Sequence, residues 1–319
     1  MNIFFVSLGC DKNLVDSEVM LGLLDAKGYQ IVDDETQADV MVINTCCFIH
    51  DAKEESIQTI LDMARYKEEG RLKALVVTGC LAQRYKQEII DEIPEVDVVL
   101  GTTSYDKIVE AVEEALEGKS EVELADINAL PLPETKRLVT TGGHYAYLKI
   151  AEGCDKHCTY CIIPYARGRV RSRNVQNVLE EVKRLAASGY QEVVLTGIHL
   201  SSYGIDCGES LLHLIQMVHQ VEGIRRIRLG SLEPRIVTET FAEELAKMEK
   251  ICPHFHLSLQ SGCDATLARM NRKYTTEEYE NACSILRKNF THPAITTDVI
   301  VGFPGETEEE FAQTKEYLK

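Results

Sequence analysis

Short apolar runs alternate with longer stretches of helical periodicity along the first 120 residues of the chain. The runs predict buried strands, and the stretches predict the helices between them, an alternation typical of a parallel α/β sheet. The expected strands are Asn2–Leu8, Ala38–Asn44, Lys73–Thr78 and Val96–Leu100. The expected helices span 16–26, 51–69, 84–92 and 104–118. We therefore predict a doubly wound parallel-sheet domain over residues 1–120.

Residues 121–143 show no periodicity and contain Pro131 and Pro133, so we interpret them as a linker. The alternation resumes over residues 144–319. The expected strands are His144–Ala151, Glu192–Gly197, Ile227–Ser231, His254–Gln260 and Ile295–Gly302, with helices near 175–188, 209–221, 238–248, 275–289 and 306–318. This pattern predicts an α/β partial (β/α)6 barrel, in which chemistry gathers at the C-terminal ends of the strands. Because the chain stops in the helix after the fifth strand, we expect the barrel to be truncated at its C-terminus.

Composition favours a cytoplasmic protein that has no membrane partner. The 319 residues are 45% hydrophobic, and no stretch of about 18 apolar residues could span a membrane. The eleven cysteines are an odd number without the spacing of a disulfide scaffold. The net charge of −17 lies mostly in residues 1–150, which carry 14 Lys and Arg against 28 Asp and Glu. Such a surface repels phosphate and attracts a basic protein, or it is simply a soluble acidic surface.

Three cysteines with the spacing C-x3-C-x2-C, Cys154, Cys158 and Cys161, follow the first strand of the second half. Three thiolates within eight residues can hold one corner of a cubane 4Fe–4S cluster and leave the fourth iron open. The alternative is structural zinc, which prefers four ligands, usually in C-x2-C pairs. His157 would have to be the fourth ligand, but it is crowded between two of the cysteines. We therefore favour the open cluster.

A second set of cysteines recurs after successive strands of the first half, at Cys10, Cys46 and Cys80. The carboxyl ends of strands in an open parallel sheet share one edge, where ligands bind. Three thiols that lie far apart in the sequence can therefore converge on one site. The alternative is three buried core cysteines, since free cysteine is often buried. Cys47 follows Cys46 directly and is expected to point elsewhere.

The segment "AEGCDKHCTYCIIP" resembles the signature loop of the radical S-adenosylmethionine (SAM) enzymes, and the two cysteine sets together resemble the methylthiotransferases over essentially the whole chain. The resemblance implies a 4Fe–4S cluster on Cys154, Cys158 and Cys161 and an auxiliary 4Fe–4S cluster on Cys10, Cys46 and Cys80. It implies that SAM binds the open iron and is cleaved to a 5′-deoxyadenosyl radical. It also implies that a methylthio group is inserted into a C–H bond, and that flavodoxin or ferredoxin donates the electron.

Two types of this family are resembled by different parts of the chain. Residues 1 to about 164, with "SLGCDKNLVDSEVMLGLL" and "VTGCLAQRY", resemble the RimO type, which modifies an aspartate of a small-subunit ribosomal protein. The remainder, with "VVLTGIHLSSYG" and "TTDVIVGFPGETEEEF", resembles the MtaB type, which modifies tRNA threonylcarbamoyl-adenosine. The C-terminal TRAM module of the family is not found. We favour the ribosomal protein or the ribosome as partner, with tRNA as the alternative and a non-catalytic iron–sulfur module as a second alternative.

Several polar residues are candidates for binding SAM or substrate. Tyr160 occupies the aromatic position that the resemblance places near the adenine of SAM. Glu233 and Gln260 follow predicted strands, where polar groups can reach the amino acid or the ribose of SAM. An alternating row of arginines would project to one side of a strand-like ribbon and bind phosphate or carboxylate, or would form a solvated loop. These arginines are Arg167, Arg169, Arg171 and Arg173.

Overall fold

The structure is a computed structural model that describes residues 1–130 and 136–319. It divides the chain into two compact units. The first unit comprises Met1–Thr141 and Ile162–Arg171, and the second comprises Gly142–Cys161 and Ser172–Lys319. Pro131 and Pro133, on which we based the predicted linker, lie outside the described residues. None of the described helices combines the length and the apolar character needed to cross a membrane.

The first unit is built on a six-stranded parallel sheet with the strand order β2-β1-β3-β4-β5-β6. Its strands are β1 (Asn2–Ser7), β2 (Gln30–Val32), β3 (Val40–Thr45), β4 (Ala74–Gly79), β5 (Val98–Leu100) and β6 (Glu121–Glu123). Its helices are α1 (Asp11–Lys27), α2 (His50–Glu68), α3 (Cys80–Tyr85), α4 (Gln87–Glu92), α5 (Ile108–Leu116) and α6 (Ile163–Arg167). The strand order reverses direction between β1 and β3, which defines a topological switch point.

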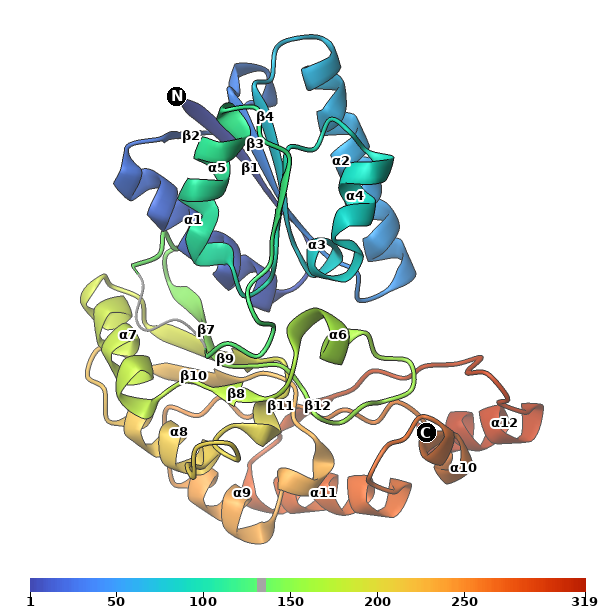
Figure 1. The fold of residues 1–319 in the computed structure, drawn as a ribbon. Coiled ribbons are helices and arrows are strands. Elements are labelled where there is room, and N and C mark those ends of the chain that lie inside the picture. Colours follow the sequence, from blue (N-terminus) through green and yellow to red (C-terminus); the bar gives the residue numbers. More distant parts are fainter. Residues whose placement is uncertain (131–135) are drawn as a thin grey trace. The chain divides into compact units, whose positions relative to one another are not determined.

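Helices cover both faces of this sheet (Figure 1). On β3, Val40 and Val42 pack in the core cluster that includes residues of α1 and α5. Met41 and Ile43, which point to the opposite face, pack in the cluster that includes residues of α2, α3 and α4. All six residues of β3 are buried, because neither face meets water. The prediction of a doubly wound parallel sheet is confirmed.

The second unit is an arc of strands. Its strands are β7 (Tyr145–Glu152), β8 (Arg171–Ser172, at the boundary of the units), β9 (Glu192–Gly197), β10 (Arg226–Leu229), β11 (His254–His256) and β12 (Ala294–Thr296). Four form a sheet in the order β10-β9-β7-β8, in which β7, β9 and β10 pair in parallel, and β11 and β12 also pair in parallel. Two bridges, Ile227–Ile251 and Leu232–Leu257, continue the arc from β10 to β11. This is the predicted partial barrel.

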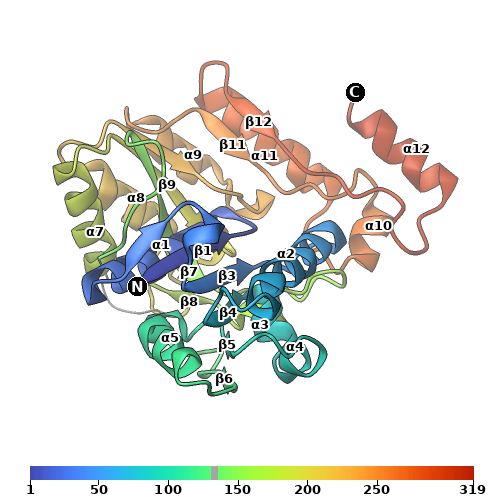
Figure 2. The same ribbon diagram turned by 90° about the horizontal axis from the view of Figure 1, so that it is seen from above.

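Helices connect the strands of the second unit and lie outside the arc, as Figure 2 shows for α7, α8 and α9. They are α7 (Val175–Ala187), α8 (Leu211–His219), α9 (Glu239–Ala246), α10 (Asp264–Arg269), α11 (Thr276–Asn289) and α12 (Glu308–Tyr317). The core between strands and helices is tightly filled. Phe255 of β11 is fully buried, and its ring centroid lies 4.9 Å from that of Phe290. The strands thus present their carboxyl ends on a rigid frame.

Three local predictions were wrong. The segment interpreted as a linker begins with β6, which pairs with β5. The hydrophobic pattern of the sequence did not reveal β6, because a strand at the edge of a sheet needs no apolar run. The helix predicted at 84–92 is two helices, α3 and α4, separated at Lys86, whose φ is 51°. Residues Ile162–Arg171 pack with the first unit rather than with the barrel. Within them α6, which a proline at its start favours, ends at Arg167, the first of the alternating arginines. Arg171 begins β8, so the arginines do not form one continuous ribbon.

Candidate functional site

The first cysteine set lies at one edge of the sheet of the first unit. Cys10 precedes α1, Cys46 follows β3, and Cys80 begins α3 directly after β4. Strands β1, β3 and β4 are neighbours in the sheet, and their last residues are in register. The three cysteines therefore occupy adjacent strand ends beside the switch point, where open α/β sheets bind ligands.

The loops that carry these cysteines touch one another. A Cβ atom added at Gly9 would lie 2.8 Å from the Cβ and 3.1 Å from the Sγ of Cys46. Gly79, directly before Cys80, has a φ of +94°, and a Cβ there would lie 2.5 Å from the carbonyl oxygen of Thr45. These approaches leave no room for side chains at either glycine. The loops are therefore packed as one group.

The thiols of this set are electrostatically coupled. Burial raises the pKa of Cys46, and it raises the pKa of Cys80 to about 11. The nearby Arg167 lowers both pKa values, and the Cys10 thiol raises them. Both thiols therefore stay protonated near neutral pH, and a metal must displace their protons when it binds. Cys10 is exposed, so the set is open to solvent on one side.

The second cysteine set lies in the loop after β7, and all three of its members are partly exposed. The backbone N–H of Cys161 donates to the carbonyl of Cys158 at 3.0 Å. Between the cysteines, His157 adopts a left-handed φ of 47°, and its carbonyl accepts a hydrogen bond from Asn271 Nδ2 at 2.9 Å. The loop is thus tightly curled and anchored within its own unit. Burial raises the pKa of Cys154 to about 11.

A cation and an aromatic ring stand beside this loop. Arg272 Nη1 donates a hydrogen bond to the Sγ of Cys158 at 3.1 Å. Tyr160 is about one-third exposed, and its ring meets Phe303 edge-on at a centroid distance of 6.1 Å. Burial raises the pKa of Tyr160 to about 12 although Arg272 opposes the rise. Tyr160 therefore offers a neutral, partly open ring next to two of the cysteines.

Glu233 and Gln260 follow β10 and β11, at the same ends of the strands as the cysteine loop. Lys156 of that loop lies 2.9 Å from Glu233, and His199 lies 3.2 Å from the same carboxylate. Burial alone would raise the pKa of Glu233, but hydrogen bonds from His199 and Lys156 lower it to about 2. Gln260 has a left-handed φ of 70°, and its backbone is hydrogen-bonded on both sides to the segment after β12.

The donor sets suit a cluster better than a single ion. All eleven cysteines lie among the described residues, and all are free thiols. Among the described residues, neither cysteine triplet has all its Sγ atoms within 4.8 Å of one another, the spacing that would surround one ion. A cubane is wider than one ion, so its ligands stand farther apart. Thiolates are also its usual ligands. The structural-zinc alternative is therefore disfavoured, and three thiols on each unit fit a 4Fe–4S cluster.

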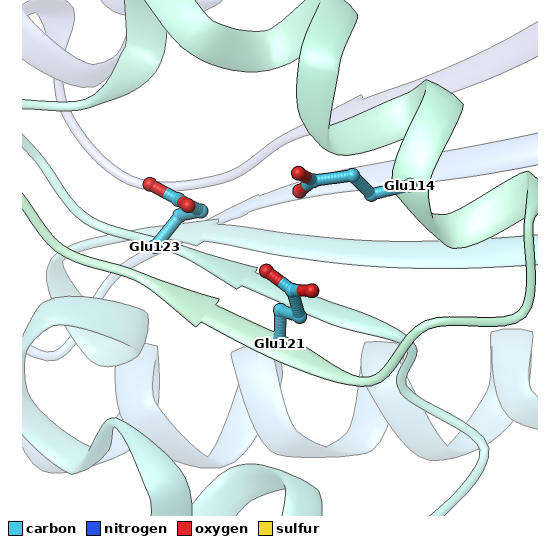
Figure 3. Close-up of side chains that lie close together, drawn as sticks. All are labelled: Glu114, Glu121 and Glu123. Atoms are coloured by element: carbon cyan, nitrogen blue, oxygen red, sulfur yellow. The ribbon is translucent and has the colours of Figure 1, made fainter.

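One acidic group does have the spacing for an ion (Figure 3). It consists of Glu114 on α5 and of Glu121 and Glu123 on β6. Burial and the two neighbouring carboxylates raise the pKa of Glu114, and Lys107 already pairs with Glu123 at 2.9 Å. Carboxylates suit hard cations rather than iron–sulfur clusters. Sequence reasoning missed this group because its members lie on two elements, and we assign it no role.

Neither the strand-like ribbon nor the solvated loop describes all four alternating arginines, since of these only Arg169 is exposed. Arg167 is 1% exposed and pairs with Asp16 at 2.6 Å. Arg171 is buried and donates to the carbonyl of Arg167 at 3.1 Å, while Arg173 pairs with Glu181 at 2.6 Å. These three cations pair within the protein, so of the four arginines only Arg169 is exposed where it could meet a phosphate. Because Arg167 is buried beside a cysteine, it belongs to the first site, a role that its spacing in the sequence did not suggest.

Two family models match the chain. The Uncharacterized protein family UPF0004 matches residues 2–101, and the Radical SAM superfamily matches residues 148–318. The chain is 49% identical over 321 residues to the ribosomal protein uS12 methylthiotransferase RimO of Lachnoclostridium phytofermentans, covering 100% of this chain and 73% of that protein. The RimO protein of Clostridioides difficile is 42% identical over 321 residues, covering 100% and 72%. The similarity to RimO proteins thus continues past residue 164, where we had compared the chain with the MtaB type.

A solved structure has the same fold. The radical S-adenosylmethionine methyltransferase TsrM of Kitasatospora setae aligns with a TM-score of 0.71 over 99% of this chain and 70% of its own. The two sequences are only 16% identical, so the likeness concerns the fold alone. It supports the predicted fold class, a parallel-sheet domain followed by a partial radical SAM barrel.

Proposed function

We propose that this chain, which belongs to the RimO-type radical SAM methylthiotransferases, inserts a methylthio group into an aspartate of ribosomal protein uS12. The observation that carries the proposal is the identity to RimO proteins over the full chain, combined with one set of three cysteines on each unit. The acidic first half supports a basic protein as partner, because opposite charges favour encounter. The tRNA alternative loses support, since three of the four arginines that would contact phosphate are engaged within the protein.

Members of this family use SAM and two 4Fe–4S clusters, and the cysteines divide naturally between them. Cys154, Cys158 and Cys161 would hold the radical SAM cluster, and Cys10, Cys46 and Cys80 would hold the auxiliary cluster. When bound, the first cluster with SAM supplies the radical that activates the substrate C–H bond, and the second supplies the sulfur. The protein's part is to hold six thiolates, to orient SAM and to place the substrate.

The residues around the second cysteine set are suited to orienting SAM. Tyr160 offers an apolar ring for the adenine, and Glu233 offers an ionised carboxylate for the ammonium or ribose of SAM. Gln260 stands on a backbone that hydrogen bonds hold in place. Arg272 holds the loop through Cys158. We further propose that the protein acts in the cytoplasm and receives its electron from a flavodoxin or ferredoxin.

Anaerobic reconstitution followed by a peptide or ribosome assay tests this function. We expect about eight irons per chain, because two cubanes hold four irons each. The Ala variants of Cys154, Cys158 and Cys161 should no longer cleave SAM. The Ala variants of Cys10, Cys46 and Cys80 should cleave SAM to 5′-deoxyadenosine and leave uS12 unmodified in mass spectrometry.

The matched control is Cys47→Ala, a buried cysteine beside Cys46 that belongs to neither set. It should retain the iron content and the activity. A fully reconstituted protein that forms no 5′-deoxyadenosine would contradict the enzyme function and favour the non-catalytic module. A methylthio group found on tRNA adenosine, with uS12 unmodified, would contradict the substrate.

A further inference from the structure

Arg167 connects α6 to the first cysteine set through all of its guanidinium nitrogens. Its Nε donates to the Sγ of Cys80 at 3.2 Å, and its Nη1 donates to Asp16 Oδ2 at 2.6 Å. Its Nη2 donates to Asn13 Oδ1. The side chains of Arg167 and Asp16 are 2% and 5% exposed, so these bonds form away from water. All four residues belong to the first unit.

Asn13 extends this network to the other two cysteine loops. Its Nδ2 donates to the carbonyl of Leu8 at 3.0 Å and to the carbonyl of Thr45 at 2.9 Å. Leu8 lies two residues before Cys10, and Thr45 directly precedes Cys46. Asn13 is fully buried. One amide and one guanidinium therefore fix the three loops relative to one another.

The bond from Arg167 Nε to Cys80 becomes stronger when a metal displaces the thiol proton, which Cys80 otherwise donates to Asn13 Oδ1 at 3.7 Å. A neutral thiol is a weak hydrogen-bond acceptor, whereas an anionic sulfur makes a strong, charge-assisted bond with a guanidinium. Asp16 pairs with Arg167, so the charge of the guanidinium is balanced without the contact with sulfur. Hydrogen bonds to cluster sulfurs and nearby positive charge both stabilise the reduced, more negative cluster.

We propose that Arg167 is a positioning residue of the auxiliary cluster that raises its reduction potential by donating to the Cys80 sulfur. This inference rests on the proposed function only in requiring that Cys80 binds the auxiliary cluster. Arg167 lies six positions after Cys161 in the sequence. One short segment therefore carries a ligand of the radical SAM cluster and a residue that raises the reduction potential of the auxiliary cluster.

The test is a redox titration followed by electron paramagnetic resonance on the full-length chain. Replacing Cys154, Cys158 and Cys161 by Ala leaves only the auxiliary cluster to be observed. In this background Arg167→Gln should make reduction at least tenfold less favourable, a negative shift of about 59 mV for one electron. Asp16→Asn should shift the potential in the opposite direction, because it removes a negative charge and leaves the guanidinium in place.

The double variant of Arg167→Gln and Asp16→Asn removes both charges, so its net charge equals that of the parent. It should show a negative shift smaller than that of Arg167→Gln, due to the lost hydrogen bond alone. The double variant also keeps the test decisive if Arg167→Gln fails to fold. In that case the reduction potentials of Asp16→Asn and of the double variant should still shift in opposite directions from that of the parent. Arg173→Gln, which removes an arginine paired with Glu181 in the second unit, is the control and should cause no shift.

Shifts of the same sign in Asp16→Asn and Arg167→Gln, or unchanged potentials throughout, would overturn the inference and leave Arg167 a structural residue. Such a result with intact methylthiolation activity would leave the proposed function standing. A parent chain that binds no auxiliary cluster at all would overturn both.

Discussion

Replacing Gly79 by alanine tests whether the close packing behind Cys80 shapes the first cysteine set. Gly79 ends β4 and has a φ of +94°. An added Cβ would lie 2.5 Å from the carbonyl oxygen and 2.7 Å from the nitrogen of Thr45, and would also overlap Asn44 Oδ1. Gly28, after α1, has the same φ of +94°, but nothing lies within 4 Å of an added Cβ. The two glycines share a positive φ, but the ψ of Gly79 is −161° and that of Gly28 is 17°, and they also differ in steric overlap.

The expected magnitudes follow from these two contributions. The left-handed conformation costs an alanine about 1–2 kcal/mol at Gly28. The backbone of Gly79, with a ψ of −161°, costs an alanine at least as much. At Gly79 the overlap adds about 1–3 kcal/mol, because the atoms in the way are backbone of β3, which is paired on both sides and cannot move aside. We therefore expect Gly79→Ala to destabilise the protein by about 2–5 kcal/mol and Gly28→Ala by about 1–2 kcal/mol.

Urea denaturation of both variants measures the difference, together with iron content after reconstitution. With an m value of about 2 kcal/mol/M, a difference of about 2 kcal/mol separates the two midpoints by about 1 M. Gly79→Ala should also lose auxiliary-cluster iron, because Cys80 follows directly and must move with its backbone. Gly28→Ala should keep both clusters. Equal midpoints and equal iron contents in the two variants would refute the steric reasoning.

Glu233→Gln should cost about 3 kcal/mol of unfolding free energy near neutral pH, since the folded-state pKa of Glu233 is about 2 against an ordinary value of 4.5. Because that pKa is lowered, the stabilisation is complete above about pH 4.5 and is lost as the pH falls toward 2, so urea curves of variant and parent should converge on acidification. Glu209→Gln, at a more exposed pair with a histidine, is the control and should cost less than about 1 kcal/mol. Phe255→Ala should destabilise the second unit by about 3–5 kcal/mol in the same assay, and a cost below about 1 kcal/mol would contradict the packing of that core. Tyr160→Ala should weaken SAM binding measured by calorimetry while Tyr160→Phe preserves it, because the ring rather than the hydroxyl would contact the adenine; equal losses in both variants would contradict that role.

Local patterns in the sequence were sufficient for the apolar strands and for both cysteine sets, but not for the short strands β2, β6 and β8. The apolar runs that became β3, β4 and β9 are buried on both faces, so the composition of each run alone reveals a strand. The placement of cysteines directly after β1, β3 and β4 was visible for the same reason. That these three ends are adjacent depends on the strand order β2-β1-β3-β4, which only the fold shows.

The edges of the fold were decided by tertiary contacts. Residues Glu121–Glu123 form β6 only because β5 offers its free edge, and nothing in their own sequence requires a strand. The alternating arginines after Cys161 showed the same limit. Period two is typical of a strand, but Arg167 ends the helix α6 and only Arg171 lies in a strand, β8.

Arg167 shows most clearly where sequence reasoning stops. The spacing of cysteines along a single loop is local chemistry, and the sequence by itself determined it. The partners of Arg167, Asp16 and Asn13, lie 151 and 154 residues away along the chain. A buried guanidinium is stable only where such groups replace its water, and only the tertiary structure brings them together.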